Sequence, residues 1–127
     1  MRRRGFSLLE TVLASGLLAA VMLMLFSLYP SSALAIRRSQ DHLQADQMAL
    51  SLLAEQQALP FGLIYTPDAP LSDVVLGPVR YRRSVEVFSV PGADPTLLKG
   101  VRATVRWEGV RGPQSVVQET RVVKLEN

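Results

Sequence analysis

The longest apolar stretch of the chain lies near its start. From residue 6 to residue 29 the sequence has 24 residues and one formal charge, at Glu10. At about 1.5 Å per residue, a helix of this length is roughly 36 Å long and crosses the hydrocarbon core of a bilayer. Arginines at positions 2–4 precede this stretch, and such a one-sided basic flank is typical of the cytoplasmic side of a membrane span. The pattern predicts a transmembrane helix over residues 6–29.

A second helical pattern covers residues 30–61. Proline at position 30 favours a bend at the start of this segment, because proline lacks an amide hydrogen and clashes with the preceding turn. Leu59-Pro60-Phe61-Gly62 ends the segment with two helix breakers. The apolar residues between them predict one buried helix face. A heptad-like stripe forms its centre and four more residues widen it: Ile36, Leu43, Leu50 and Leu53, then Ala45, Met48, Ala49 and Leu52.

The remaining residues, 62–127, have the period-two alternation of β-strands. Strands are predicted at Val79–Val90, Val101–Glu108 and Val116–Leu125, with loops at 91–95 and 109–113. Residues 64–78 are rich in turn formers and predict a connecting loop, with a possible short strand at 73–76. Loops this short favour a three-stranded antiparallel meander. With the helix face as its cover, the sheet completes an α+β fold, in which a long N-terminal helix packs on a small antiparallel sheet.

The faces of these strands also predict individual roles. Val101, Ala103, Val105 and Trp107 alternate with polar residues, so Trp107 is interpreted as a core residue. Arg83 interrupts the apolar face of the first strand. The basic group Arg80, Arg82 and Arg83 is compatible with DNA or another anionic partner. We interpret it as a charged strand face that discourages edge-to-edge pairing, because Glu86, Glu108 and Glu119 lie in the same strands.

Composition restricts the chemistry of the chain. The formal net charge is +3, from 14 basic and 11 acidic residues, and the three arginines before Gly5 account for this excess. The rest of the chain is near neutral and has no overall nucleic-acid footprint. There is no cysteine, which excludes disulfides and thiolate chemistry, and His42 is the only histidine. His42 is interpreted as a solvated surface residue. The sequence has no phosphate-binding glycine loop, and we expect neither an enzyme nor a cofactor or metal site.

Glu10 is the unusual residue of the predicted span. A carboxylate near the head of a span is costly and requires a partner, yet no basic residue follows it before Arg37. Further along, Ser15 with Ala19 and Gly16 with Ala20 have the small-xxx-small spacing that lets helices approach closely. Either Glu10 remains at the membrane interface, or a group outside this span meets it.

Gly5-Phe6-Ser7-Leu8-Leu9-Glu10, with a basic leader before it and an apolar run after it, resembles the N-terminus of type IV prepilins. Type IV pilins and the pseudopilins of type II secretion and competence systems share this signal. The resemblance implies cleavage after Gly5 by a prepilin peptidase, N-methylation of Phe6 and a role for Glu10 in assembly. Residues 1–5 would be the leader, and residues 6–29 would be the transmembrane and filament-core helix.

The resemblance also implies partners and a location. Residues 49–55 and 105–107 are similar to segments of PilV-type minor pilins and I-type minor pseudopilins. The expected partners are other pilin or pseudopilin subunits, the prepilin peptidase, an inner-membrane assembly platform and membrane lipid before assembly. The expected location is the bacterial inner membrane with an extracytoplasmic C-terminal domain, and then a filament. Whether that filament is a type IV pilus, a competence pilus or a type II secretion pseudopilus stays open.

Three other interpretations of the N-terminus remain. Ala33-Leu34-Ala35 fits a signal-peptidase site, and cleavage after Ala35 would release an exported periplasmic domain. The apolar run is longer than the roughly 7–15 residues of a secretory signal, which disfavours this interpretation. Arg3-Arg4-Gly5-Phe6 has the form of a twin-arginine export signal. The last interpretation is a single-pass anchor that is never cleaved.

Overall fold

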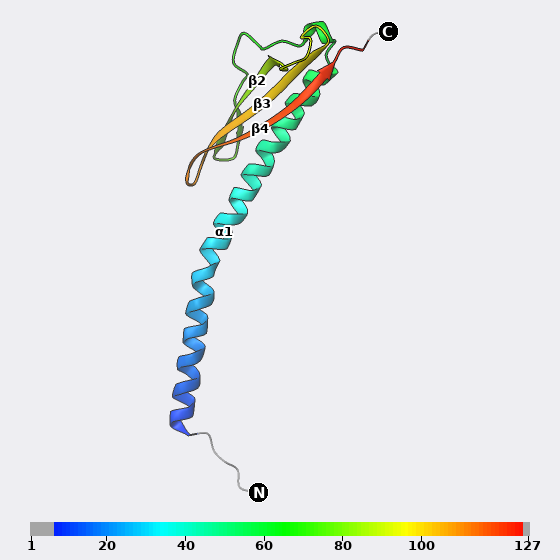
Figure 1. Ribbon diagram of the computed structural model, residues 1–127. Helices are drawn as coiled ribbons and strands as arrows, with labels where there is room; N and C mark the ends of the chain where they lie inside the picture. Colours follow the sequence, from blue (N-terminus) through cyan, green and yellow to red (C-terminus); the bar gives the residue numbers. More distant parts are fainter. Residues whose placement is uncertain (1–6, 126–127) are drawn as a thin grey trace. The chain divides into compact units, whose positions relative to one another are not determined.

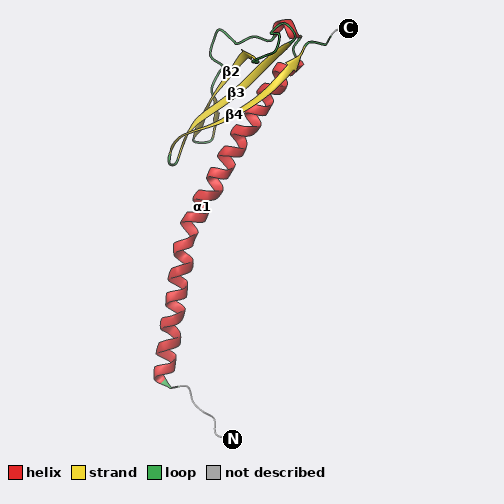
Figure 2. Ribbon diagram, viewed as in Figure 1, coloured by secondary structure: helices red, strands yellow, loops and turns green. Residues whose placement is uncertain are grey.

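The computed structural model describes residues 7–125 (Figures 1 and 2). The elements in chain order are the helix α1 (Leu8–Ala58), the 3-10 helix η1 (Phe61–Leu63) and four strands, β1 (Val74–Leu76), β2 (Val79–Ser89), β3 (Leu98–Gly109) and β4 (Gly112–Val123). The chain divides into two compact units, with the boundary between Arg37 and Arg38. The predicted leader at residues 1–5, including Gly5, and the predicted methylation at Phe6 lie outside the described residues.

In the first unit, α1 is apolar and exposed. Every described residue up to Arg37 is exposed, and this unit contains a stretch long and apolar enough to cross a membrane. Pro30 lies inside the helix, and the helical assignment continues through it from Leu8 to Ala58. Pro30 has no amide hydrogen to donate to the carbonyl of Phe26, but one missing bond does not end a helix whose remaining turns are intact. The long N-terminal helix of the predicted fold is therefore confirmed, and Pro30 does not break it.

The second unit contains an antiparallel sheet in the order β1-β2-β3-β4. The sheet has one strand more than the predicted meander, because the residues of the possible short strand pair with the start of β2, Val74 opposite Tyr81. The β3–β4 hairpin turns through only two residues, Val110 and Arg111. Gly112 follows them at φ +110°, a backbone conformation that side chains rarely tolerate. Figure 1 shows β2, β3 and β4 lying side by side.

The core of this unit lies between the sheet and residues 45–53 of α1. Trp107 and the other apolar residues of its face of β3 are buried, as the alternation predicted. The α+β class, with the long helix packed on a small antiparallel sheet, is confirmed. The buried residues are Ala45, Ala49, Leu52 and Leu53 from α1, Ile64 from the loop, and Tyr81, Val85, Val101, Ala103, Val105, Trp107 and Val116 from the sheet.

The predicted centre of the buried helix face was wrong. Ile36, Leu43 and Leu50 are 58%, 59% and 50% exposed, and Leu53 alone of that stripe is buried. The helix has 3.6 residues per turn, so residues spaced by seven shift by about 20° around a straight helix with each heptad. A stripe with this spacing therefore does not stay on the helix face that packs on the sheet. The helix instead approaches the sheet through Ala45 and Ala49, whose small side chains allow close contact.

Arg83 also has a structural role that its position in the sequence did not reveal. Its guanidinium donates hydrogen bonds to the backbone carbonyl of Ser72, from Nε at 3.2 Å and from a terminal nitrogen at 3.0 Å. Arg83 therefore fastens the loop before β1 to the face of β2. This leaves Arg80 and Arg82, of the predicted basic group, on the opposite face of the sheet.

Candidate functional site

Glu10 lies in the first turn of α1 and its side chain is exposed. The backbone amides of Glu10 and Thr11 donate to the carbonyl of Ser7, at 2.9 and 3.1 Å, so the helix is established at this position. A carboxylate in the first turn interacts favourably with the positive end of the helix dipole. The helix dipole therefore stabilises the Glu10 carboxylate, but the N-terminus of a helix carries only about half a positive charge and does not neutralise it.

No basic side chain of its own span is available to Glu10. The next basic residue in the chain is Arg37, which is 27 residues later and roughly 40 Å away along a helix. The hydroxyl of Thr11 donates to the carbonyl of Ser7, and that of Ser15 donates to the carbonyl of Thr11. Residues 11–36 therefore supply no counter-charge to Glu10.

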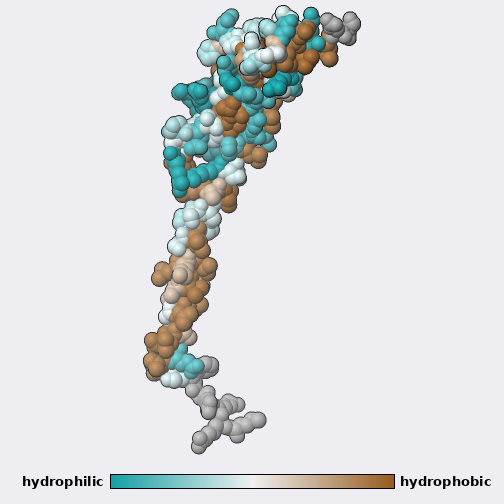
Figure 3. All heavy atoms as spheres, in the orientation of Figure 1, coloured by the Kyte–Doolittle hydropathy of each residue, from teal (hydrophilic) through white to brown (hydrophobic). Residues whose placement is uncertain are grey.

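The exposed surface of the first unit suits contact with other helices. Apolar side chains cover the visible face of this part of α1 (Figure 3). Gly16 has open space where a side chain would be, and Ser15, Ala19 and Ala20 beside it are small and exposed. Small residues at this spacing let two helix backbones approach closely within a membrane.

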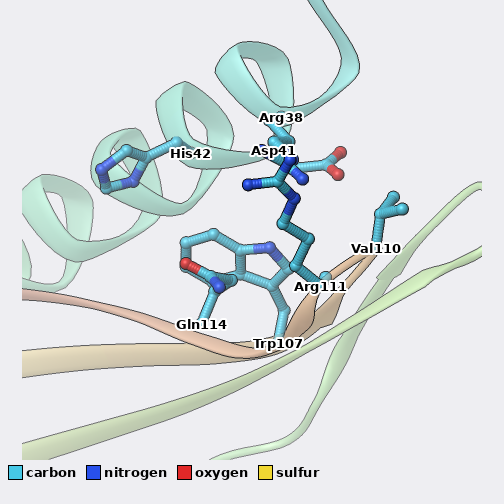
Figure 4. Close-up of a pocket in the computed structure, with 8 residues that line it drawn as sticks. Arg38, Asp41, His42, Trp107, Val110, Arg111 and Gln114 are labelled. Carbon is cyan, nitrogen blue, oxygen red and sulfur yellow. The ribbon is translucent and has the colours of Figure 1, made fainter. Parts of the chain in front are cut away.

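In the second unit, Trp107 lies between two hollows. The hollow on the helix side has a volume of ≈ 240 Å³, and Arg38, Asp41, His42 and Arg111 contribute to its lining. Figure 4 shows the Arg111 side chain extending from the hairpin past Trp107 toward Arg38 and Asp41. The structure therefore brings together charged groups from the helix and from a hairpin that are about 70 residues apart in sequence.

His42 is exposed, as predicted, but it also contacts the core tryptophan. Its ring centroid lies 5.8 Å from that of Trp107 at an interplanar angle of 39°, and Tyr81 lies equally far from Trp107 on another side. The Tyr81 hydroxyl donates to Oε1 of Gln44 at 3.1 Å. Burial and the nearby Asp41 carboxylate raise the pKa of Tyr81. Three aromatic rings and one hydrogen bond thus join this turn of α1 to the sheet.

The second hollow, of ≈ 460 Å³, has Arg82 and Arg106 in its lining. These two arginines are directly opposite each other on β2 and β3. Four residues along the same face, Arg102 contacts two carboxylates, Glu119 at 2.6 Å and Glu86 at 3.2 Å. On this face two carboxylates therefore compensate the charge of Arg102, whereas Arg82 and Arg106 form no salt bridge within the described residues.

Sequence reasoning identified Arg82 but missed Arg106, which lies opposite it, and Arg38 and Arg111, which line the other hollow. The position of Arg106 opposite Arg82 depends on the register of β2 and β3, which residues 90–97 connect. The approach of Arg38 to Arg111 depends on helix–sheet packing, which no local pattern reports. Among residues 7–125, no cluster of three potential metal ligands is present.

Comparisons with protein-family models, with curated proteins and with solved structures gave no match to this chain.

Proposed function

We propose that this chain is a structural subunit of a type IV pilus-like filament, a minor pilin or pseudopilin. In this proposal a prepilin peptidase cleaves after Gly5, Phe6 is N-methylated, and Glu10 directs assembly. The partners are other pilin or pseudopilin subunits and an inner-membrane platform. The protein is stored in the inner membrane before it enters the filament.

One observation carries the proposal: a carboxylate without a partner in its own span lies five positions after Gly5, at the head of an exposed apolar helix. Cleavage after Gly5 would create an α-amine at Phe6, and such an amine has a reference pKa of about 7.7–8.0 and is mostly cationic at neutral pH. Both groups lose hydration when helices pack together. An unpaired buried charge is strongly unfavourable and a matched pair compensates for it, so Glu10 of one subunit would attract the amine of another.

The fold is consistent with this role. An apolar helix with open space at Gly16 offers a surface for neighbouring helices. In the second unit, residues 45–53 of α1 pack on a small sheet. The alternative of an exported domain released after Ala35 has one supporting observation, since the second unit begins three residues later, at Arg38. The length of the apolar run disfavours that alternative.

The experiment is mass spectrometry of the N-terminus of the protein isolated from its native membrane. We expect a chain that begins with N-methylated Phe6. A chain that begins at Ile36 would establish an exported domain instead, and one that begins at Met1 or Arg2 would establish an uncleaved anchor. Either of these last results would overturn the proposed filament function.

A further inference from the structure

Four arginines gather at one end of the second unit, and we call them the basic end: Arg38, Arg82, Arg106 and Arg111. Arg38 and Arg111 line the hollow on one side of Trp107, and Arg82 and Arg106 line the hollow on the other side. The ion pairs among residues 7–125 are made by other arginines, Arg80 and Arg102. Within residues 7–125, none of the four arginines of the basic end forms a salt bridge.

This arrangement has an energetic cost in the isolated subunit. Like charges directly opposite on neighbouring strands are destabilising, and Arg82 and Arg106 occupy such a pair of positions. Arg80 and Arg83 also line the second hollow, where Arg80 pairs with Asp73. Asp41 in the first hollow and Glu108 in the second are the lining carboxylates, so the two hollows have six arginines and two carboxylates in their linings. An anion between the guanidinium groups would remove this repulsion. Guanidinium groups bind phosphate oxygens in a bidentate manner, and this favours a phosphate ligand.

Chain connectivity places Arg38, one of the four arginines of the basic end, close to the end of the predicted span. Arg38 is nine residues after Tyr29, the last residue of the predicted span, and α1 is helical between them. Nine residues extend about 14 Å along a helix. The polar headgroup layer is about 5–8 Å thick on each side of the hydrocarbon core, and a long arginine side chain reaches back toward it from beyond. Lipid phosphates are therefore within reach of Arg38, and Arg111 lines the same hollow as Arg38.

We propose that the basic end binds the phosphate groups of anionic phospholipids in the leaflet where the helix leaves the membrane. This contact holds the second unit against the bilayer. The inference rests on α1 spanning a membrane, which is one part of the proposed function. It does not depend on cleavage after Gly5 or on filament assembly.

Trp107 is the single tryptophan of the chain and lines both hollows, so its fluorescence reports on this site. The full chain is reconstituted into nanodiscs of phosphatidylcholine alone, or of phosphatidylcholine with phosphatidylglycerol. Each set contains the same fraction of a lipid with a nitroxide on its headgroup, which quenches nearby tryptophan. We expect stronger quenching with phosphatidylglycerol, and a decrease of that excess when NaCl is raised, because salt screens exposed charges.

The test variant is Arg38→Gln with Arg111→Gln. We expect the ratio of docked to undocked protein in phosphatidylglycerol to fall roughly fivefold for each arginine removed. The matched control is Arg121→Gln, an exposed arginine opposite Gly100 and away from Trp107, which should behave as the original chain. The salt series on the unaltered chain supplies a test that does not depend on the folding of any variant.

Equal quenching in the two lipid mixtures, or quenching unchanged in the double variant, would overturn the inference alone. A chain that an alkaline wash removes from the bilayer would overturn the membrane anchor and this inference together. Quenching that follows the expected pattern in a protein found to keep Met1 would support the inference and count only against the filament proposal. The three failures are therefore distinguishable.

Discussion

The ring of Phe88 lies against the backbone of Gly100, its direct partner across β2 and β3. A Cβ atom at Gly100 would overlap the far edge of that ring. The guanidinium carbon of Arg102 lies 4.9 Å from the centroid of the same ring, and its nitrogens contact Glu86 and Glu119. Because Gly100 has no side chain, the Phe88 ring can lie on the Gly100 backbone and contact the guanidinium of Arg102 at the same time.

Gly100→Ala should destabilise the protein by about 1 kcal/mol, at the low end of the range for overpacking, because the Phe88 ring must move away from Arg102. In a Phe88→Ala background the same substitution should be neutral or stabilising, since alanine restricts the unfolded chain more than glycine does. Thermal unfolding of the four proteins in a double-mutant cycle measures this change of sign. The absence of any coupling between the two positions would contradict the contact.

The corrected helix face gives a second prediction. Ala49 is fully buried against the sheet, whereas Ala54 is exposed on the same helix. Ala49→Leu should lower the free energy of unfolding by about 1–3 kcal/mol, because the added atoms force the helix away from the sheet. Ala54→Leu should change it by no more than about 0.5 kcal/mol. Denaturant unfolding in detergent compares the two variants, and equal effects would refute this orientation of the helix.

The proposed role of Glu10 gives a third prediction. Glu10→Ala should leave cleavage after Gly5 intact and reduce recovery in purified filaments roughly a hundredfold, because the α-amine of a neighbouring subunit would be buried without its partner. Quantitative mass spectrometry of membrane and filament fractions measures both steps. Glu55→Ala, which removes an exposed carboxylate elsewhere on the helix, is the matched control. Normal incorporation of the Glu10 variant would rule out the assembly role.

The β2–β3 loop gives a pH-dependent prediction. One carboxylate oxygen of Asp94 accepts hydrogen bonds from the backbone amide and the hydroxyl of Thr96, at 2.8 and 2.7 Å. These bonds, led by the hydroxyl, lower the pKa of Asp94. Because the pKa is lower in the folded state, the ionised Asp94 carboxylate stabilises the folded protein. This stabilisation is fully present above the ordinary aspartate pKa of about 3.9, and it is lost as the pH falls through the pKa of the folded state.

Asp94→Asn should therefore have a lower thermal midpoint than the original protein at pH 7, with a difference that shrinks below about pH 4. Thermal unfolding across this pH range measures the effect. The control is Asp68→Asn, because Asp68 lies in another loop and accepts no side-chain hydrogen bond within the described residues. A midpoint difference that is constant from pH 7 to pH 3 would show that the Asp94 charge is not responsible.

Local patterns predicted most of the elements. The alternation from Val101 to Trp107 identified a strand and its buried face, and the strand limits differ from the structure by a few residues. The short strand β1 had a weaker signal because its three residues pair only with the start of β2. The role of Arg83 could not be predicted, since its partner is a backbone carbonyl at Ser72 whose position depends on the path of a loop.

One part of the candidate site could be predicted from the sequence and the other could not. The prepilin-like motif around Glu10 is visible in the sequence, because it consists of residue types at fixed spacing. The basic end is not, because Arg38 and Arg111 meet only when the helix lies on the sheet. The amphipathic pattern of residues 30–61 is compatible with more than one orientation of the helix, and the choice between them depends on contacts with other elements.

The sequence by itself determined the apolar helix, the three main strands and the inward face of β3, because the periodicity of a helix or a strand is a property of neighbouring residues. Only the tertiary structure decided that Ala45 and Ala49, rather than Leu43 and Leu50, face the sheet. The physical reason is shape: burial of the leucines would gain more apolar area, but the alanines allow the helix and the sheet to approach closely enough to cover Trp107 and its neighbours.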